Sequence, residues 1–293
     1  MSTETISQDY QGLDAWDAGA IMRAVTAGNL HAIRAVEAAM SQLEAAAAGI
    51  EPRLRSGGRL FYAGAGTSGR LGVMDAAELA PTFGFDRTAV LLAGGGEAQE
   101  RAKEGAEDDV DAAATDVDAA GVGPQDALIG VAASGRTPYT VAAVQRARER
   151  GAFTVGMANN RATPLLQVGD VGVLLETGPE VLAGSTRLAA GTAQKAALNA
   201  LSTAVLVRLG GAYDNLMVGM RPLNAKLKRR AVEIVAMAAR LEDAEAEAVL
   251  ERAGGDIRTA IVMAGTGSSA ASAAAWLAEN GMSVRAAIAA GRR

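Results

Sequence analysis

A short apolar run, a glycine-rich turn and a stretch of helix-forming residues follow one another between residues 59 and 80. Residues 60–63 are apolar and long enough for a buried strand, and the turn GAGTSG (64–69) interrupts them. A strand that passes through such a turn into a helix directs several backbone N–H groups, and the positive end of the helix dipole, at one point. The hydroxyls of Thr67 and Ser68 stand at that point, so the turn suits a phosphate or another anion.

Two other interpretations of this turn compete with a phosphate site. Gly64, Gly66 and Gly69 satisfy the G-x-G-x-x-G pattern of dinucleotide-binding domains, which alone is weak evidence. Such a domain should carry an acidic residue at the end of its second strand to bind the ribose. The next apolar run ends in three glycines before Glu97, which makes that residue a poor ribose ligand. A second hydroxyl-rich turn, described below, favours a sugar phosphate over a nucleotide. A tight strand–helix turn without a ligand is the other alternative.

The same succession recurs in the middle of the chain. An apolar run over 126–133 is followed by the polar turn SGRTP (134–138) and a predicted helix over 139–150. Strands that alternate with helices predict a parallel sheet covered on both faces, with ligands beyond the carboxyl ends of its strands. Both turns are therefore expected at one edge of the sheet. The hydroxyl side chains expected to bind phosphate are Thr67, Ser68, Ser134 and Thr137, with Ser185 and Thr186 as further candidates.

Hydrophobic periodicity, with glycine and proline breaks, predicts an α/β fold. Strands are expected over 60–63, 88–93, 126–133, 153–158 and 171–175. Two helices are expected within 15–48, with a break at Gly28-Asn29, and others over 66–80, 97–106, 139–150, 180–209, 226–240, 243–252, 257–264 and 269–280. We therefore predict an N-terminal helical segment (1–50), a ligand-binding α/β domain (51–224) and a small helical C-terminal domain (225–293).

Composition argues against several classes of function. The 293 residues carry a formal net charge of −5, no cysteine and no basic stripe with interleaved aromatics, so disulfides and thiolate metal sites are excluded and nucleic acid is not expected as a partner. No apolar run approaches the roughly 20 residues that span a bilayer, and the polar N-terminus does not resemble a signal peptide. We therefore expect a cytoplasmic protein without a membrane partner. A surface or packing role is expected for the single histidine, His31.

Acidic residues offer candidates for proton transfer rather than for metal binding. Asp108-Asp109 has no third ligand at a fixed spacing, so we interpret it as a solvated turn and expect no metal. Glu78 lies on the helix that begins at the first turn, roughly 15 Å along the axis from Ser68, and could reach the far end of a bound sugar or a partner's site. Glu107 follows the next predicted helix. A carboxyl group in apolar surroundings can deliver a proton near neutral pH, although spacing alone favours surface roles for both glutamates.

Five stretches of the chain resemble, in order, the motifs of one family. They are GAGTSGR (64–70), DAAE with PTFG (75–84), EGAEDD (104–109), AASGRTPY (132–139) and GSTRLAAGTAQK (184–195). Together they closely resemble N-acetylmuramic acid 6-phosphate etherases over nearly the whole chain. The resemblance implies a sugar isomerase (SIS) fold, which is a flavodoxin-like three-layer αβα sandwich with a five-stranded parallel sheet, and a ubiquitin-associated (UBA)-like helical C-terminal domain. It also implies homodimers whose sites are completed across the interface, and a relationship to the glucokinase regulatory protein.

The resemblance further assigns roles to the glutamates. The proton donor of the family's D-A-S-E motif matches Glu78, and a second essential glutamate matches Glu107 rather than Glu104. The implied lyase reaction removes D-lactate from N-acetylmuramic acid 6-phosphate by β-elimination and hydration, in cell-wall sugar recycling, without a metal or nicotinamide cofactor. Glu107 is the expected base at carbon 2. The expected substrate-binding residues are Gly66, Thr67, Ser68, Ser134, Arg136, Thr137, Ser185, Thr186 and Lys195.

Some positions depart from the family pattern. Ala77 and Leu79 stand where the family has serine and cysteine, Ala189 replaces a lysine, and the usual asparagine after the opening Thr3-Glu4 is missing. Two alternatives to the etherase therefore remain. One is a regulator that binds a sugar phosphate without turning it over, and the other is an aldose–ketose phosphate isomerase, which needs only one base.

Overall fold

The computed structural model describes residues 2–99, 103, 105–222 and 224–292. The chain divides into two compact units. The first contains Met1–Ala76 and Arg87–Ser202, and the second contains Ala77–Asp86 and Thr203–Arg293. Helices α3 (Gly66–Phe83) and α7 (Ala189–Leu206) begin in the first unit and end in the second. This division differs from the three predicted domains, whose boundaries stay a prediction.

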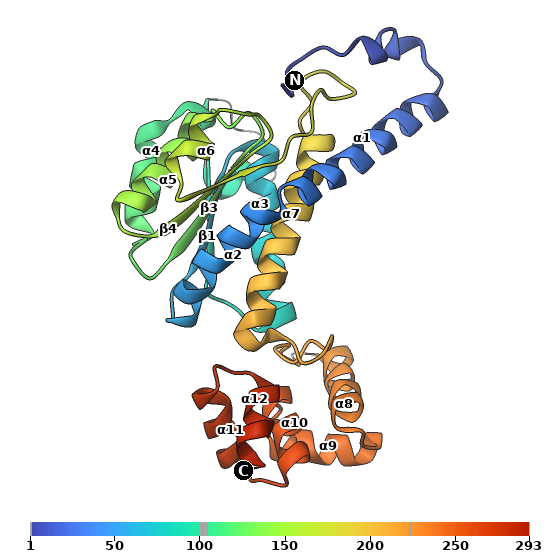
Figure 1. The fold of residues 1–293 in the computed structure, drawn as a ribbon, viewed down its shortest axis with the longest axis vertical. Helices are drawn as coiled ribbons and strands as arrows, with labels where there is room; N and C mark the ends of the chain where they lie inside the picture. The colour runs from blue at the N-terminus through green and yellow to red at the C-terminus, as the bar shows by residue number, and fades with distance from the viewer. Residues whose placement is uncertain (1, 100–102, 104, 223, 293) are drawn as a thin grey trace. The chain divides into compact units, whose positions relative to one another are not determined.

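A parallel sheet forms the centre of the first unit (Figure 1). Within the described residues its strands are β1 (Leu60–Gly64), β2 (Thr88–Leu92), β3 (Ala127–Ala132), β4 (Phe153–Ala158) and β5 (Val171–Leu174), and they lie in the order β2-β1-β3-β4-β5. Every neighbouring pair is parallel. The five predicted strands are confirmed to within a residue or two at each end, because each is a short apolar run bounded by glycine or polar residues.

Helices cover the sheet on both faces, as Figure 1 shows. On one face, α4 (Val110–Ala119), α5 (Pro138–Glu149) and α6 (Pro164–Val168) share a buried cluster with alternate strand residues such as Phe61, Leu128 and Ala158. On the other face, α2 (Met40–Arg55) packs against β3, β4 and β5. The predicted three-layer αβα arrangement is confirmed, since both faces of a parallel sheet must be buried.

Several predicted helix boundaries are wrong. Helix α1 (Ala18–Ala38) runs through Gly28 without a break, and the interruption comes at Ala39, before α2. Helix α3 continues through Pro81 to Phe83 instead of ending near residue 80, and Gly84, with φ of +68°, follows it. The helix expected over 180–209 begins only at Ala189, and a π turn over Val207–Gly211 follows its end. Propensity alone places such boundaries poorly because packing overrides it.

The helix expected over 97–106 is also not found in the described residues of that stretch. Gly96–Gln99 forms a 3₁₀ turn (η3), and a second 3₁₀ turn (η4) covers Ala106–Asp108. Residues 100–102 and 104 lie outside the described residues. Two further short 3₁₀ turns, η1 (Gln8–Tyr10) and η2 (Leu13–Ala15), precede α1. Within the stretch 97–106, Gly105 has a positive φ of +75°, which a continuous helix does not contain.

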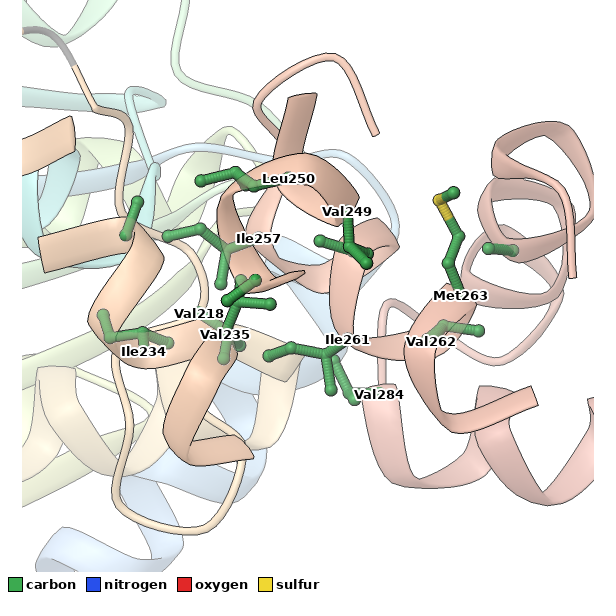
Figure 2. Close-up of a cluster of buried hydrophobic side chains, with 14 of the residues drawn as sticks. Val218, Ile234, Val235, Val249, Leu250, Ile257, Ile261, Val262, Met263 and Val284 are labelled. Carbon is green, nitrogen blue, oxygen red and sulfur yellow. The ribbon is translucent and has the colours of Figure 1, made fainter. Parts of the chain in front are cut away.

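The C-terminal part of the second unit is helical, as predicted. Its helices are α8 (Ala225–Ala239), α9 (Asp243–Arg252), α10 (Ile257–Thr266), α11 (Ala270–Glu279) and α12 (Val284–Gly291), the last of which was not predicted. Figure 2 shows their shared core, where Ile234, Val249 and Ile261 pack with Val218. Within the described residues, no single helix could cross a membrane by length and composition, and only the pair α10 and α11, bent by 108°, passes such a test.

Candidate functional site

The two hydroxyl-rich turns leave neighbouring strands at the same edge of the sheet. Strand β1 ends at Gly64, which lies opposite Val131 near the end of β3. The strands lie in the order β2-β1-β3-β4-β5, so the chain passes from β1 to β2 on one side and from β3 to β4 on the other. Open α/β sheets bind ligands at such a switch point, beyond the carboxyl ends of the strands. The expected position of the two turns at one edge is confirmed.

The first turn is tight because glycine backbones meet there. A Cβ on Gly64 would lie 2.9 Å from the Gly69 backbone and 3.0 Å from the Val131 carbonyl oxygen. Strand β1 and helix α3 can therefore approach this closely only without side chains at these positions. Gly66 is exposed at the start of α3, Thr67 is half-buried, and Ser68 is buried. The two hydroxyls are thereby held at the start of α3, where an anion is favoured.

The second turn is shaped by its own hydrogen bonds. The Arg136 N–H donates to the Ser134 hydroxyl oxygen at 3.1 Å, and the Ser134 and Thr137 hydroxyls lie 3.5 Å apart. Gly135 has a φ of +65°, and a Cβ there would overlap the Thr163 side chain. No side chain of the described residues caps the start of α5, which follows Thr137 directly. The turn thus presents two hydroxyls, the exposed Arg136 and an uncapped helix end to an anion.

The start of α7 already holds an internal carboxylate. Glu180 is buried, and its two carboxylate oxygens accept hydrogen bonds from the N–H groups of Ala189 and Ala190, both at 2.9 Å. Residues 181–188, with the half-buried Ser185 and Thr186, form the loop between them. Sequence reasoning missed this role because it interpreted Glu180 as the first residue of the helix. An external anion would have to compete with Glu180 for these amides.

Helix α7 brings the GSTRLAAGTAQK motif (184–195) beside the two hydroxyl-rich turns. A Cβ on Gly191 would lie 3.6 Å from the Thr67 side chain, so α7 and α3 touch near their starts. Deeper along α7, the buried Gln194 donates its side-chain N–H to Asn159 at 2.8 Å, and the Asn159 N–H donates to the Ala133 carbonyl. The Ser134 turn, the end of β4 and α7 are therefore connected through Asn159, which sequence reasoning did not select.

The opening residues also reach this edge of the sheet. Thr3 is fully buried, and it exchanges hydrogen bonds at 2.9 Å with the side chain of Asn160. Asn160 in turn donates to the Ala133 carbonyl, directly before Ser134. The N-terminus was described from the sequence only as polar, and these contacts were not predicted. The Thr3-Glu4 pair, noted as a family motif, was the only sequence signal for this anchoring.

Glu107 lies in the first unit, close to the end of β2. It is exposed on the 3₁₀ turn η4, which Asp109 terminates by capping α4 through a hydrogen bond from the Ala112 N–H. A Cβ on Gly94, two residues after β2, would lie 3.3 Å from the Ala106 side chain. Glu107 therefore occupies the same edge of the sheet as the two hydroxyl-rich turns. Glu104, which the family motif also contains, lies outside the described residues.

Glu78 lies on the part of α3 that belongs to the second unit, and its side chain is exposed. Its neighbour Leu79 is buried. The two glutamates thus fall in different units, and their meeting in one site stays a prediction.

A buried carboxylate on α3 was also missed. Asp75 is 2% exposed, accepts a hydrogen bond from the Tyr62 hydroxyl at 2.7 Å, and forms an ion pair with the Lys195 ammonium at 3.9 Å. Burial, followed by the charge of Asp75 and its hydrogen bond, raises the pKa of Tyr62 well above its usual value. Tyr62 therefore stays a hydrogen-bond donor to Asp75 at physiological pH.

Metal ligands do not gather at this edge. Among the described residues, no group of three or more His, Asp or Glu side chains could hold an ion. The described side chains at this edge are instead hydroxyls, Glu107 and Lys195, together with the starts of three helices. Such a set can bind a phosphate and transfer protons.

Comparisons with known proteins give the same picture. The family model of the glucokinase regulatory protein N-terminal SIS domain matches residues 41–148, and that of the SIS domain matches residues 108–204. An N-acetylmuramic acid 6-phosphate etherase of Deinococcus radiodurans is 52% identical over 93% of this chain and 90% of the relative. One of Rubrobacter xylanophilus is 48% identical over 99% of this chain and 97% of the relative.

The chain belongs to the N-acetylmuramic acid 6-phosphate etherase family. Its similarity to relatives of this name extends across both units, so it is not confined to the SIS domain. The resemblance inferred from five motifs is thereby confirmed, and the chain is an enzyme by family.

A solved structure supports the fold of this etherase family member independently. The E. coli CFT073 protein c3406 superimposes with a TM-score of 0.50 at 16% identity. The match covers 68% of this chain and 97% of that protein. At this level of identity the likeness concerns the fold alone, and it confirms the SIS-type architecture.

Proposed function

We propose that this protein is a carbon–oxygen lyase that converts N-acetylmuramic acid 6-phosphate and water to N-acetylglucosamine 6-phosphate and D-lactate, in cell-wall amino-sugar recycling. The observation that carries the proposal is the 52% identity to a named etherase over 93% of the chain. The presence of Glu78 and Glu107 in the two motifs that carry the family's acid and base supports it further. The predicted cytoplasmic location fits this role and stays a prediction.

The proposed reaction proceeds through the open-chain aldehyde of the sugar. The aldehyde acidifies the proton on carbon 2, which the Glu107 carboxylate accepts, and the electron pair of the broken C–H bond forms an enolate. The enolate then expels the lactyl oxygen from carbon 3 while Glu78 protonates it, which leaves a carbon 2–carbon 3 double bond. Water adds to carbon 3 after giving a proton to Glu78, and carbon 2 regains a proton. Each acid–base step is worth about 10²–10⁴-fold in rate.

The phosphate of the substrate is proposed to bind between the first two turns. Thr67 and Ser68 at α3, with Ser134 and Thr137 at α5, face the switch point of the sheet from its two sides. Exposed Arg136 adds a positive charge that can bind phosphate oxygens in a bidentate manner. Substrate contacts of Gly66, Ser185 and Thr186 are part of the same proposal, although Glu180 occupies the amides at the start of α7.

The decisive assay follows D-lactate release from N-acetylmuramic acid 6-phosphate by the purified protein. We expect turnover by the wild type and at least about a hundredfold loss of kcat in Glu78→Gln and Glu107→Gln, since each removes an acid–base group. Glu245→Gln, an exposed glutamate on α9, is the matched control and should retain full activity. Failure of the wild type to release lactate would refute the proposal.

Isotope exchange separates the two glutamates. In D₂O, a variant that lacks the carbon 2 base cannot exchange the hydrogen on carbon 2, whereas a variant that lacks only the acid still can. We therefore expect Glu107→Gln to lose exchange and lactate release together, and Glu78→Gln to lose lactate release but keep exchange. The opposite pattern would interchange the roles of the two residues.

Two other outcomes would identify the alternative functions. Binding of sugar phosphates without lactate release would favour a regulator, which the match to the glucokinase regulatory protein model keeps open. Interconversion of fructose and glucose phosphates with an intact lactyl ether would favour an isomerase. Both alternatives use the phosphate turns, but neither requires two glutamates.

We also propose that the active form is a homodimer whose sites are completed across the interface. Helix α1 carries an exposed apolar stripe, in which Met22 and Leu30 are each 63% exposed and Ile33 is 42% exposed. A second copy of the chain is the proposed cover for this stripe, because such large apolar side chains are otherwise unfavourably hydrated. Light scattering should give twice the chain mass for the wild type and less for Leu30→Glu.

Mixing the two inactive variants tests whether one site draws its glutamates from both subunits. If Glu78 and Glu107 of one site come from different chains, mixed dimers of Glu78→Gln and Glu107→Gln contain one intact site. Random mixing of C₂ dimers should then restore about a quarter of wild-type activity. If each subunit supplies both of its own glutamates, no mixed dimer contains an intact site and activity stays absent.

A further inference from the structure

Asp75 is a buried charge that the proposed reaction does not use. Its side chain accepts hydrogen bonds from the Tyr62 hydroxyl at 2.7 Å and from the Ser202 hydroxyl at 3.4 Å. A buried carboxylate is costly unless it is paired and hydrogen-bonded. Its cationic partner is Lys195 on α7, at 3.9 Å. The α3–α7 contact therefore contains an ion pair that an apolar contact would replace at lower cost if stability alone were required.

Lys195 lies at the boundary between this buried cluster and solvent. Its side chain is 30% exposed, whereas that of Asp75 is 4% exposed. The ammonium donates to the Asn199 side-chain oxygen at 2.6 Å and pairs with Asp75. Since an ammonium has three donors, these described contacts leave at least one N–H group for a ligand. Asp75 and Asn199 thus fix the ammonium on its protein side, and its solvent side can bind an oxygen of a ligand.

The position of the ammonium along α3 separates it from the phosphate turns. Thr67 lies beside Gly191, and Asp75 lies beside Ser202, so α3 and α7 run side by side in the same direction (Figure 1). Asp75 follows Thr67 by eight residues, which is about 12 Å along the helix axis. The Lys195 ammonium points toward Asn199 and Asp75, away from the start of α7. A phosphate held at Thr67 is out of its reach.

We propose that Lys195 binds the sugar at its reacting end, where its ammonium stabilises the enolate oxygen, and that Asp75 and Tyr62 are positioning residues for it. This inference rests on the proposed etherase function. A sugar whose phosphate lies at Thr67 therefore has the end remote from the phosphate, with carbons 1 to 3, on the side of Lys195. Fixed positive charge at a developing oxyanion is among the largest contributions to catalysis.

The test compares kcat with KM in four variants. Lys195→Met should lower kcat by about 10²–10³-fold, as expected for the loss of one preorganised oxyanion donor, with KM nearly unchanged. Exchange of the carbon 2 hydrogen in D₂O should fall by the same factor, because the enolate forms in that step. Lys195→Arg should recover part of the activity. Asp75→Asn, which keeps an acceptor for Tyr62 but removes the charge that holds Lys195, should lower kcat by about tenfold, and Tyr62→Phe by less.

Controls distinguish this inference from the proposed function. Lys228→Met, at an exposed lysine on α8, should leave kcat and KM unchanged. Ser68→Ala should raise KM and weaken inhibition by N-acetylglucosamine 6-phosphate, whereas Lys195→Met should not. An inactive wild type refutes the etherase itself. An active wild type with Lys195→Met equal to Lys228→Met, or with KM raised at constant kcat, refutes only the assignment of Lys195. Unfolding midpoints of the variants show whether each one still folds. If Asp75→Asn does not fold, Tyr62→Phe and Lys195→Met still test the assignment.

Discussion

Replacement of Glu180 by alanine tests how the start of α7 is held. The side chain is 1% exposed, and it accepts two backbone N–H hydrogen bonds of 2.9 Å. A hydrogen bond to a charged group contributes about 1.5–3 kcal/mol, so two such bonds set an upper bound of about 3–6 kcal/mol. Loss of an ordinary helix cap costs about 0.5–2 kcal/mol. Because alanine would leave the Ala189 and Ala190 amides buried without an acceptor, we expect Glu180→Ala to lower the free energy of unfolding by about 3–4 kcal/mol.

Two matched variants separate charge from shape. Glu180→Gln keeps the length of the side chain and one carbonyl oxygen, so it should cost about 2 kcal/mol. Glu176→Gln removes a carboxylate four residues earlier, where the side chain is 33% exposed and bonded to Arg161. Ion pairs of this kind contribute about 0–1 kcal/mol, and the cost should stay in that range. Urea unfolding followed by circular dichroism gives the three values, and hydrogen exchange of a peptide spanning 186–200 reports the α7 amides directly.

Anion rescue provides a second readout for the same reasoning. In Glu180→Ala the amides at the start of α7 are vacant, and helix starts bind anions such as sulfate or phosphate. Added sulfate should therefore raise the unfolding midpoint of Glu180→Ala more than that of the wild type. The assignment of Glu180 as the cap would be refuted by two results together. Glu180→Ala would lower the free energy of unfolding by less than about 1 kcal/mol, no more than Glu176→Gln does, and the exchange of the α7 amides would stay unchanged.

Three further predictions concern single side chains of the first unit. Gly135→Ala should destabilise the protein by about 1–3 kcal/mol in thermal or urea unfolding, because φ is +65° and the new methyl group would overlap Thr163. Burial raises the pKa of Asp126, but hydrogen bonds from Arg59 and Gly123 outweigh it, and the net pKa lies below the usual value. This stabilisation is present above the unfolded pKa of about 3.9 and is lost as pH falls through the lower folded value. Asp126→Asn should therefore lower the free energy of unfolding by about 2 kcal/mol at pH 7. The unfolding free energy of the variant should also fall less steeply on acidification than that of the wild type. Tyr139→Phe removes a hydrogen bond of 2.6 Å to Asp116 and should cost about 1–2 kcal/mol, measured against the wild type by urea unfolding.

The central sheet and the two turns were predictable because their signals are local. Strand β4 was predicted at the residues where it occurs, Phe153–Ala158, since it is a short apolar run between a glycine and two asparagines. The turns at Gly64 and Ser134 were predictable because glycine and hydroxyl residues directly follow apolar runs. Parallel pairing then places both turns at one edge without any knowledge of the tertiary structure.

The errors arise where distant residues decide a local structure. Helix propensity could not show that the Glu180 carboxylate folds onto amides nine residues later, so a helix start was predicted at the cap itself. Gly28 was taken for a break, but it packs beside Val181 and Ala189 and remains helical. The contact of Thr3 with Asn160 was not predicted, because the two residues lie 157 positions apart. Such contacts leave no periodic pattern in the sequence.

The helix starts at this edge of the sheet also suggest which way the substrate lies. An anion is attracted to the start of a helix, and α3, α5 and α7 all begin there. Glu180 neutralises the start of α7, whereas no side chain of the described residues caps α5. A phosphate is therefore attracted to the starts of α3 and α5, which lie on either side of the switch point. If the phosphate lies there, the sugar extends along the side of α3 that carries Asp75 and that faces Lys195 on α7. We infer that Glu180, by occupying the start of α7, leaves the phosphate only the starts of α3 and α5 and so gives the substrate a single orientation.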